Sequence, residues 1–274
     1  MKNPLSFRAG WISAAFVAFS GVSSEAAIVY ASAGSSYSQN FNSLAASGAS
    51  NAWANDSTLA GWHAVQTGAT PSSWSVYQAA NGSAAQGALL SIGTGTNSDR
   101  ALGGQNANTT APAVTDMLYA LQVTNSTGGI LSSFTLGYTL EQWRFVQNEI
   151  VDKMTLQYQV FSAGSGSITA ASGWTTVASL SPNAPVVSSA ASAAIDGNAS
   201  GNRVSVADTV AVSWDAGSEL WLRWVDTSSG INAAAGATRA MFGIDDVSFS
   251  AVPEPSAMLL GGLGLIGLLR RRRG

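Results

Sequence analysis

The chain has 274 residues, of which 46% are hydrophobic and 10% are charged, and its formal net charge is −3. Between residues 28 and 250 there are 13 acids and 6 bases, a net charge of −7, which disfavours nucleic-acid binding because such binding depends on Lys and Arg neutralising phosphates. The chain has no cysteine, which excludes disulfides, thiolate nucleophiles and cysteine-ligated zinc.

The first 27 residues have the layout of a secretory signal peptide. Lys2 and Arg8 come first, and the apolar run WISAAFVAFSGV follows. Small residues then extend to Ala27. A charged start, a short apolar segment and a small-residue cleavage site occur in this order in such peptides. We therefore predict that residues 1–27 direct export, in preference to forming an amphipathic helix of the folded protein.

Three tryptophans in loop-like surroundings are candidates for stacking on sugar rings: Trp53, Trp74 and Trp174. An exposed indole on a β-sandwich is a common device for binding carbohydrate, because its face is apolar and its edge is polar. The alternative for each of the three is that it fills the core.

Alternating apolar and polar residues recur from residue 118 onward. Every second residue is apolar in four segments, 134–140, 154–160, 210–214 and 220–224, which is typical of half-buried strands. Clusters of Gly, Ser, Asn and Pro separate these segments and are typical of turns, and no segment has the pattern of a long amphipathic helix. The sequence predicts an all-β fold, an antiparallel β-sandwich or jelly roll, over residues 28–250.

Catalytic groups are sparse. His63 is the single histidine, and there is no G-x-S-x-G nucleophile elbow. Glu141, Glu149 and Glu219 could supply paired carboxylates, but no spacing forces any two of them together. We expect a protein that is not an enzyme. The alternative is a secreted hydrolase that acts on a polysaccharide or ester.

The string DGNASG is a candidate calcium loop, because Asp196 and Asn198 place oxygens at alternate positions before a glycine. The twelfth position is Ala207, where an EF-hand has Glu, so this is not an EF-hand. The alternative is an Asx-turn in which the same side chains satisfy backbone amides.

A second pair of candidate metal ligands, Asp245 and Asp246, stands in the string GIDDV. In a regular strand the two side chains point to opposite faces, so one could reach a calcium ion while the other meets solvent. The alternative is that the buried aspartate pairs with Arg223, because a buried carboxylate needs a charged partner.

The chain ends in three successive parts. Pro253, Glu254 and Pro255 come first, and residues 257–269 follow without a charge. As a helix these 13 residues would extend roughly 20 Å, which is short against a hydrocarbon core of about 30 Å. The last part is a run of cations that would stop translocation and stay in the cytoplasm: Arg270, Arg271, Arg272 and Arg273.

This tail, residues 251–274, resembles the PEP-CTERM sorting signal of Gram-negative bacteria. The resemblance implies that a membrane-embedded exosortase recognises the Pro-Glu-Pro motif and removes the hydrophobic helix. The protein would be anchored transiently in the inner membrane, and then released or attached at the cell surface or in an extracellular polymer matrix. The alternative is an ordinary single-span anchor.

Six short strings resemble a bacterial extracellular β-sandwich domain that occurs in PEP-CTERM proteins and beside secreted nuclease or phosphatase modules. The strings are GWHA (61–64), SDRALGG (98–104), EQWR (141–144), IDGN (195–198), LRWVD (222–226) and FGIDDVSF (242–249). The resemblance implies a fold rather than an activity. We expect an exported, non-catalytic surface or matrix protein that is structural or binds polysaccharide.

Overall fold

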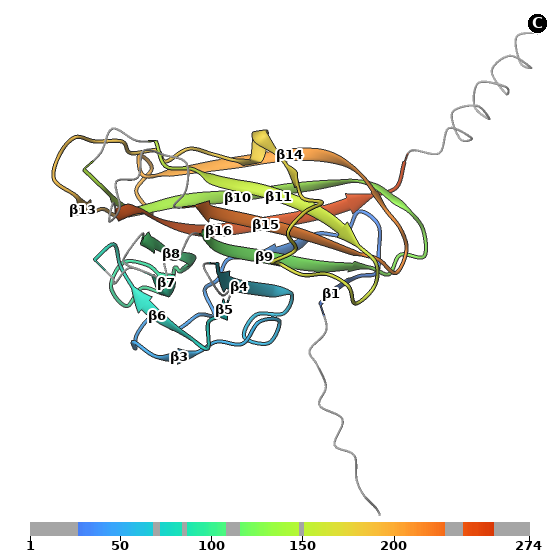
Figure 1. Ribbon diagram of the computed structural model, residues 1–274, viewed down its shortest axis with the longest axis horizontal. Helices are drawn as coiled ribbons and strands as arrows, with labels where there is room; N and C mark the ends of the chain where they lie inside the picture. The colour runs from blue at the N-terminus through green and yellow to red at the C-terminus, as the bar shows by residue number, and fades with distance from the viewer. Residues whose placement is uncertain are drawn as a thin grey trace, which may run out of the picture.

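The computed structural model describes residues 27–67, 72–83, 87–107, 116–147, 151–227 and 238–254. This part of the chain is all-β, with two sheets, one short 3-10 helix at Ala178–Leu180 and no α-helix (Figure 1). The predicted signal peptide, apart from Ala27, and the predicted hydrophobic helix lie outside the described residues. Within them, no helix is long and apolar enough to span a membrane.

The first sheet has seven strands. Its order is β12 (Thr175–Thr176), β11 (Met154–Phe161), β15 (Glu219–Thr227), β9 (Asp116–Asn125), β4 (Trp62–Gln66) and β5 (Ser72–Ser73), with β1 (Ile28–Tyr30) also paired to β9. All pairs are antiparallel except β1 with β9.

The second sheet has nine strands. Its order is β13 (Ala193–Ala194), β10 (Leu131–Phe145), β16 (Thr238–Val252), β8 (Ala101–Ala107), β7 (Leu89–Ile92), β6 (Val76–Ala80) and β3 (Asn51–Ala52). Two further strands join it: β14 (Arg203–Trp214) pairs with β10, and β2 (Tyr37–Gln39) pairs with β16.

Successive long strands alternate between the two sheets, since β9, β11 and β15 belong to the first and β10, β14 and β16 to the second. The long strands run along the molecule, and β3 to β7 gather beside one end of them (Figure 1). This arrangement is consistent with the predicted β-sandwich. The finer prediction of a jelly roll stays a prediction.

The core lies between the sheets and consists of the side chains that the alternating pattern marked as apolar. Phe134, Leu136, Tyr138 and Leu140 on β10 are each at most 2% exposed. Trp224 on β15 stacks on Trp62, with ring centroids 5.4 Å apart, and meets the ring of Tyr138 edge-on at 5.5 Å. Removal of these apolar side chains from water favours folding.

Candidate functional site

The face of the seven-stranded sheet that points away from the core carries a mixture of aromatic and polar side chains. Leu220, Leu222 and Trp224 point into the core, so Trp221 and Arg223 point outward from the same strand. Polar side chains of the other strands share this outer face: Gln157 and Gln159 on β11, Gln122 on β9, and His63 on β4. Except for Trp221, these outward residues are half-buried.

Residues 162–173, between β11 and β12, form a strap across part of this face. The Gly164 N–H donates to Glu219 Oε1 at 2.7 Å, and Trp221 Nε1 donates to Glu219 Oε2 at 3.0 Å. Gly166 lies so close to the indole that a Cβ there would be 2.0 Å from Trp221 Nε1. Only glycine fits at this position without displacing the strap or the ring.

Arg223 lies at the edge of the strap and stacks on Trp174. Its Cζ is 3.8 Å from the Trp174 ring centroid. Nη1 donates to the Ile168 carbonyl at 2.7 Å, and Nε and Nη2 donate to Gln157 Oε1 at 3.1 and 2.5 Å. Burial lowers the pKa of Arg223 to about 10, so the guanidinium is charged at neutral pH. Every one of these hydrogen-bond acceptors is neutral.

His63 continues the surface on the other side of Trp221. The two rings have centroids 4.6 Å apart, and His63 Nε2 is 3.0 Å from Gln122 Oε1. Burial lowers the pKa of His63, which favours the neutral imidazole. We call this surface the Arg223 face, and its members are His63, Gln122, Gln157, Trp174, Trp221 and Arg223.

The three predicted stacking tryptophans have different environments. Trp53 is 3% exposed, packs edge-on against Tyr77 and donates to Asn55 Oδ1, so the prediction that it stacks on a ligand is wrong. It fills the core instead, because its ring is apolar and a nearby amide satisfies its N–H. Trp74 is half-buried and packs against the core. Trp174 is also half-buried, but it belongs to the Arg223 face.

The first candidate calcium string forms an Asx-turn. Asp196 Oδ1 accepts from the Asn198 N–H and from Thr94 Oγ1, both at 3.1 Å, and Asn202 Nδ2 donates to the Asp196 carbonyl at 2.7 Å. Asp196 and Thr94 also line a shallow depression with Asn81. The Asp196 carboxylate that the sequence offered to calcium therefore holds two loops together.

The second string does not form a regular strand, because the pairing of β16 with β10 shifts register between Asp245 and Ser248, so the two aspartates do not simply point to opposite faces of the sheet. Asp246 is exposed at a positive φ of 49°, whereas Asp245 is 4% exposed and shares the outer face of the nine-stranded sheet with Glu141. Burial, with repulsion from neighbouring carboxylates, raises the pKa of Asp245 to about 8 and that of Glu141 to about 7.

Asp245 does not pair with Arg223, so that alternative is wrong. The two residues lie on strands of different sheets, and Arg223 binds Gln157 and Ile168. In the described ranges, no three carboxylate or imidazole side chains come together in a group that could hold a metal. Calcium binding stays a prediction without a site.

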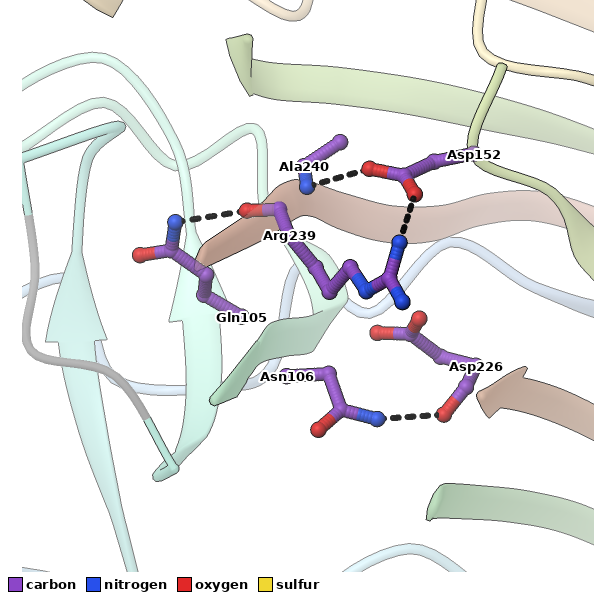
Figure 2. A network of polar contacts seen from close by, with 6 residues as sticks. All are labelled: Gln105, Asn106, Asp152, Asp226, Arg239 and Ala240. Atoms are coloured by element: carbon purple, nitrogen blue, oxygen red, sulfur yellow. Dashed lines mark hydrogen bonds and ion pairs between the residues drawn. The ribbon is translucent and has the colours of Figure 1, made fainter. Parts of the chain in front are cut away.

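A buried polar network that the sequence analysis missed joins the sheets at one end of the sandwich (Figure 2). Arg239 on β16 is 1% exposed and forms an ion pair with Asp152 at 3.3 Å. Asp152 Oδ2 also accepts from the Ala240 N–H at 2.7 Å. Gln105 Nε2 donates to the Arg239 carbonyl at 2.7 Å, which fixes the backbone of this strand against β8.

Asp226 on β15 completes this network from the other sheet (Figure 2). Its carbonyl accepts from Asn106 Nδ2 at 2.8 Å. Burial raises the pKa of Asp226 well above its ordinary value, and the charges of Asp152 and Asp116 add to the effect. The available sequence signal was an arginine next to the apolar residues of a strand, in TRAMFG.

The C-terminal end of the described chain leads out of the sandwich. Tyr30 Oη accepts from the Ala251 N–H at 2.8 Å and donates to its carbonyl at 3.0 Å, and β16 ends at Val252. Pro253 and Glu254 are exposed, whereas Pro255 and Arg270 to Arg273 lie outside the described residues. Residues 251–273 match the PEP-CTERM protein-sorting motif. The chain carries a PEP-CTERM sorting signal.

This sorting signal confirms the prediction made from the tail and implies that the protein is exported and sorted at its C terminus. No curated protein matches the chain. Among solved structures, the K1 cleaved adhesin domain of Lys-gingipain from Porphyromonas gingivalis W83 is 14% identical over 80% of this chain and 99% of that one, with a TM-score of 0.34. The TmCBM61 structure in complex with β-1,4-galactotriose is 10% identical over 56% of this chain and 71% of that one, with a TM-score of 0.25. Likeness at these TM-scores carries no argument about function.

Proposed function

We propose that the protein is a non-catalytic surface or extracellular-matrix protein that binds polysaccharide after an exosortase has removed its C-terminal tail. The sorting signal at residues 251–273 supports the export and processing steps. The Arg223 face supports the binding step. The host would be a Gram-negative bacterium, with the tail as a transient anchor in the inner membrane.

The end of the fold favours processing at the Pro-Glu-Pro motif. Val252 is the last strand residue, and the described motif residues Pro253 and Glu254 are exposed directly after it. A cut at this point leaves every described strand intact, together with the hydrogen bonds of Tyr30 to Ala251. The mature sandwich would therefore survive the loss of its anchor.

Mass spectrometry of the protein from the surface fraction of its host tests the processing step. We expect both terminal segments to be missing. The variant Glu254→Ala should accumulate in the membrane fraction with its tail intact, whereas Glu219→Gln should be processed normally if it folds. An intact Arg270 to Arg273 tail on wild-type protein at the surface would contradict the proposal.

The observation that carries polysaccharide binding is the half-exposed pair Trp174 and Arg223 beside the amides of Gln157 and Gln122. Sugar rings offer apolar C–H faces and hydroxyl groups, so a surface that combines indole with amide donors and acceptors matches both. The strap holds this arrangement through its contacts with Trp221 and Arg223, which lowers the entropy lost on binding.

The environment of His63 supports a non-catalytic role. Its hydrogen bond goes to the amide of Gln122 rather than to a carboxylate that could orient it or a hydroxyl that it could activate. Its ring packs against Trp221, which fits a contribution to a binding surface.

Glycan-array binding by the exported protein tests this function. We expect the protein to bind a defined set of polysaccharides. Trp174→Ala should lower its affinity for them about tenfold or more, because the contact with the ring is lost. Thr135→Ala, an exposed substitution on the other sheet, is the matched control and should bind normally. Turnover of a polysaccharide or ester that is abolished in His63→Gln would instead support the hydrolase alternative.

A further inference from the structure

We infer that the Arg223 face selects polysaccharides that carry carboxylate groups, such as uronic-acid polymers, and that Arg223 is the group that binds the carboxylate. This inference rests on the proposed polysaccharide binding and specifies its ligand class. It comes from the charge and hydrogen bonding of Arg223 rather than from the shape of the surface.

Arg223 is a half-buried cation without a carboxylate partner among the described residues. The salt bridge found among the described residues joins Arg239 to Asp152, at the end of the sandwich. The neighbours that Arg223 binds are a backbone carbonyl, a side-chain amide and the face of an indole. A guanidinium in such surroundings keeps its net charge available to a ligand.

The guanidinium also has unused donors. It carries five N–H groups, of which one each on Nε, Nη1 and Nη2 is engaged by Gln157 or Ile168. One N–H remains on each terminal nitrogen. Arginine binds carboxylates through paired N–H groups of this kind, and such charge-assisted bonds are roughly twice as strong as neutral ones.

Among the described residues, three other ionisable groups lie on the outer face of this sheet, and none of them forms a salt bridge with Arg223. The charge of Asp116 on β9 acts on Arg223 without a direct contact. His63 has a lowered pKa and favours the neutral form. Glu219 is 6% exposed, and its two oxygens accept from Gly164 and Trp221 beneath the strap. Arg223 is therefore a cation of this face without a direct contact to any described carboxylate, in a domain whose residues 28–250 have a net charge of −7.

The position of Arg223 is fixed before a ligand arrives. Trp174 covers one side of the guanidinium, and Trp174 Nε1 is in turn held by the Ala170 carbonyl at 2.9 Å. A long cationic side chain that is already ordered loses little entropy on binding. With Trp174 beside the guanidinium and Gln122 on the same face of the sheet, a bound uronate would meet a cation, an amide and an aromatic ring.

The test compares carboxylated polymers with uncharged forms of the same backbone. The probes are polygalacturonate and alginate, each beside its esterified form, titrated into the exported protein by calorimetry. We expect the acid forms to bind at least about tenfold more tightly, because the ester removes the acceptor charge. Raising NaCl from about 0.05 to about 0.5 M should weaken the acid forms only.

Variants at Arg223 complete the test. Arg223→Gln should lose about tenfold in affinity for the acid forms and change less for the esters, because it removes the charge and the paired donors and keeps a polar amide. The affinity of Arg223→Lys for the acid forms should lie between those of wild-type protein and Arg223→Gln, since lysine keeps the charge without the paired donors. Gln122→Ala, the control on the same face, should weaken acid and ester forms alike. Circular dichroism establishes that each variant is folded.

Two outcomes separate this inference from the function on which it rests. Equal affinity of wild-type protein for acid and ester forms, or preference for a sulfated polymer, would overturn carboxylate selection and leave polysaccharide binding standing. The absence of binding to every polymer, on the array and in solution, would overturn the proposed function as well. The comparison of acid with ester uses wild-type protein and needs no variant to fold.

Discussion

Arg239 and Arg223 lie on the two sheets of the same sandwich in opposite circumstances. Arg239 is 1% exposed and paired with Asp152, at a place where the sheets meet. Arg223 is half-buried on an outer face, where it stacks on Trp174 and donates to neutral groups. One guanidinium is neutralised inside the protein, and the other keeps its charge at the surface.

The difference teaches what each arginine contributes. A buried ion pair leaves an uncompensated charge when one partner is lost, so its removal costs stability. A half-exposed cation on a supported surface contributes little to stability, but its charge can meet a ligand. Substitutions at the two positions should therefore affect different measurements.

The largest effect is expected from Arg239→Met, which keeps the aliphatic volume and removes the charge. Asp152 would stay buried beside Asp226 without a cation, and the free energy of unfolding should fall by about 3–5 kcal/mol. Urea unfolding followed by fluorescence measures this. The matched variant Arg223→Met should cost only about 1 kcal/mol. Equal losses at both positions would break the distinction between them.

The acidic pair on the outer face of the nine-stranded sheet is expected to give the second largest effect. The pKa of Asp245 is raised to about 8, so the folded protein binds more protons than the unfolded chain from about pH 4 to pH 8. This contribution to stability is complete below the unfolded pKa and is lost as the pH rises through the folded pKa. Glu141 acts in the same direction.

Asp245→Asn tests this pH dependence, because asparagine stays neutral at every pH. The variant should match wild-type protein near pH 4 and exceed its free energy of unfolding by several kcal/mol at pH 8, since one pKa unit corresponds to about 1.4 kcal/mol. Urea unfolding at pH 4, 6 and 8 gives the comparison. The exposed control Asp215→Asn should show no such trend. A constant difference across pH would exclude Asp245 as the titrating group.

Gly166→Ala should have a smaller effect on stability and a clear effect on binding. The added methyl group would collide with Trp221 Nε1, so the strap must move, at a cost of about 1–3 kcal/mol. Thermal unfolding measures the loss, and polysaccharide titration measures the change at Arg223. Gly164→Ala is not a suitable control, because Gly164 has a φ of 69°, which strains any residue other than glycine. The control is Ser165→Ala, which leaves the backbone of the strap unchanged. Normal binding by Gly166→Ala would show that the strap does not support the Arg223 face.

The smallest effect is expected from Asp196→Ala. The substitution removes the acceptor for Asn198 and Thr94, which should cost about 1 kcal/mol. Melts in millimolar calcium and in EGTA show whether calcium stabilises the protein at all, and Asp196→Ala should leave any shift unchanged because this carboxylate serves an Asx-turn. Loss of a calcium shift in this variant would place calcium at the loop after all.

The sequence by itself determined the sorting signal, because residues 251–273 act through a linear order of motif, apolar segment and cations rather than through a fold. It also determined the all-β class. Alternation with a period of two marks which face of a strand is buried, as Phe134 and Leu220 illustrate.

Only the tertiary structure decided what the individual polar and aromatic residues do. Trp53 and Trp174 look alike in sequence, but the first is in the core and the second lies beside Arg223. Arg239 and Asp152 are 87 positions apart and meet because β16 passes the start of β11. Side-chain roles of this kind depend on contacts between strands that are distant in the chain, and a local pattern carries no information about those contacts.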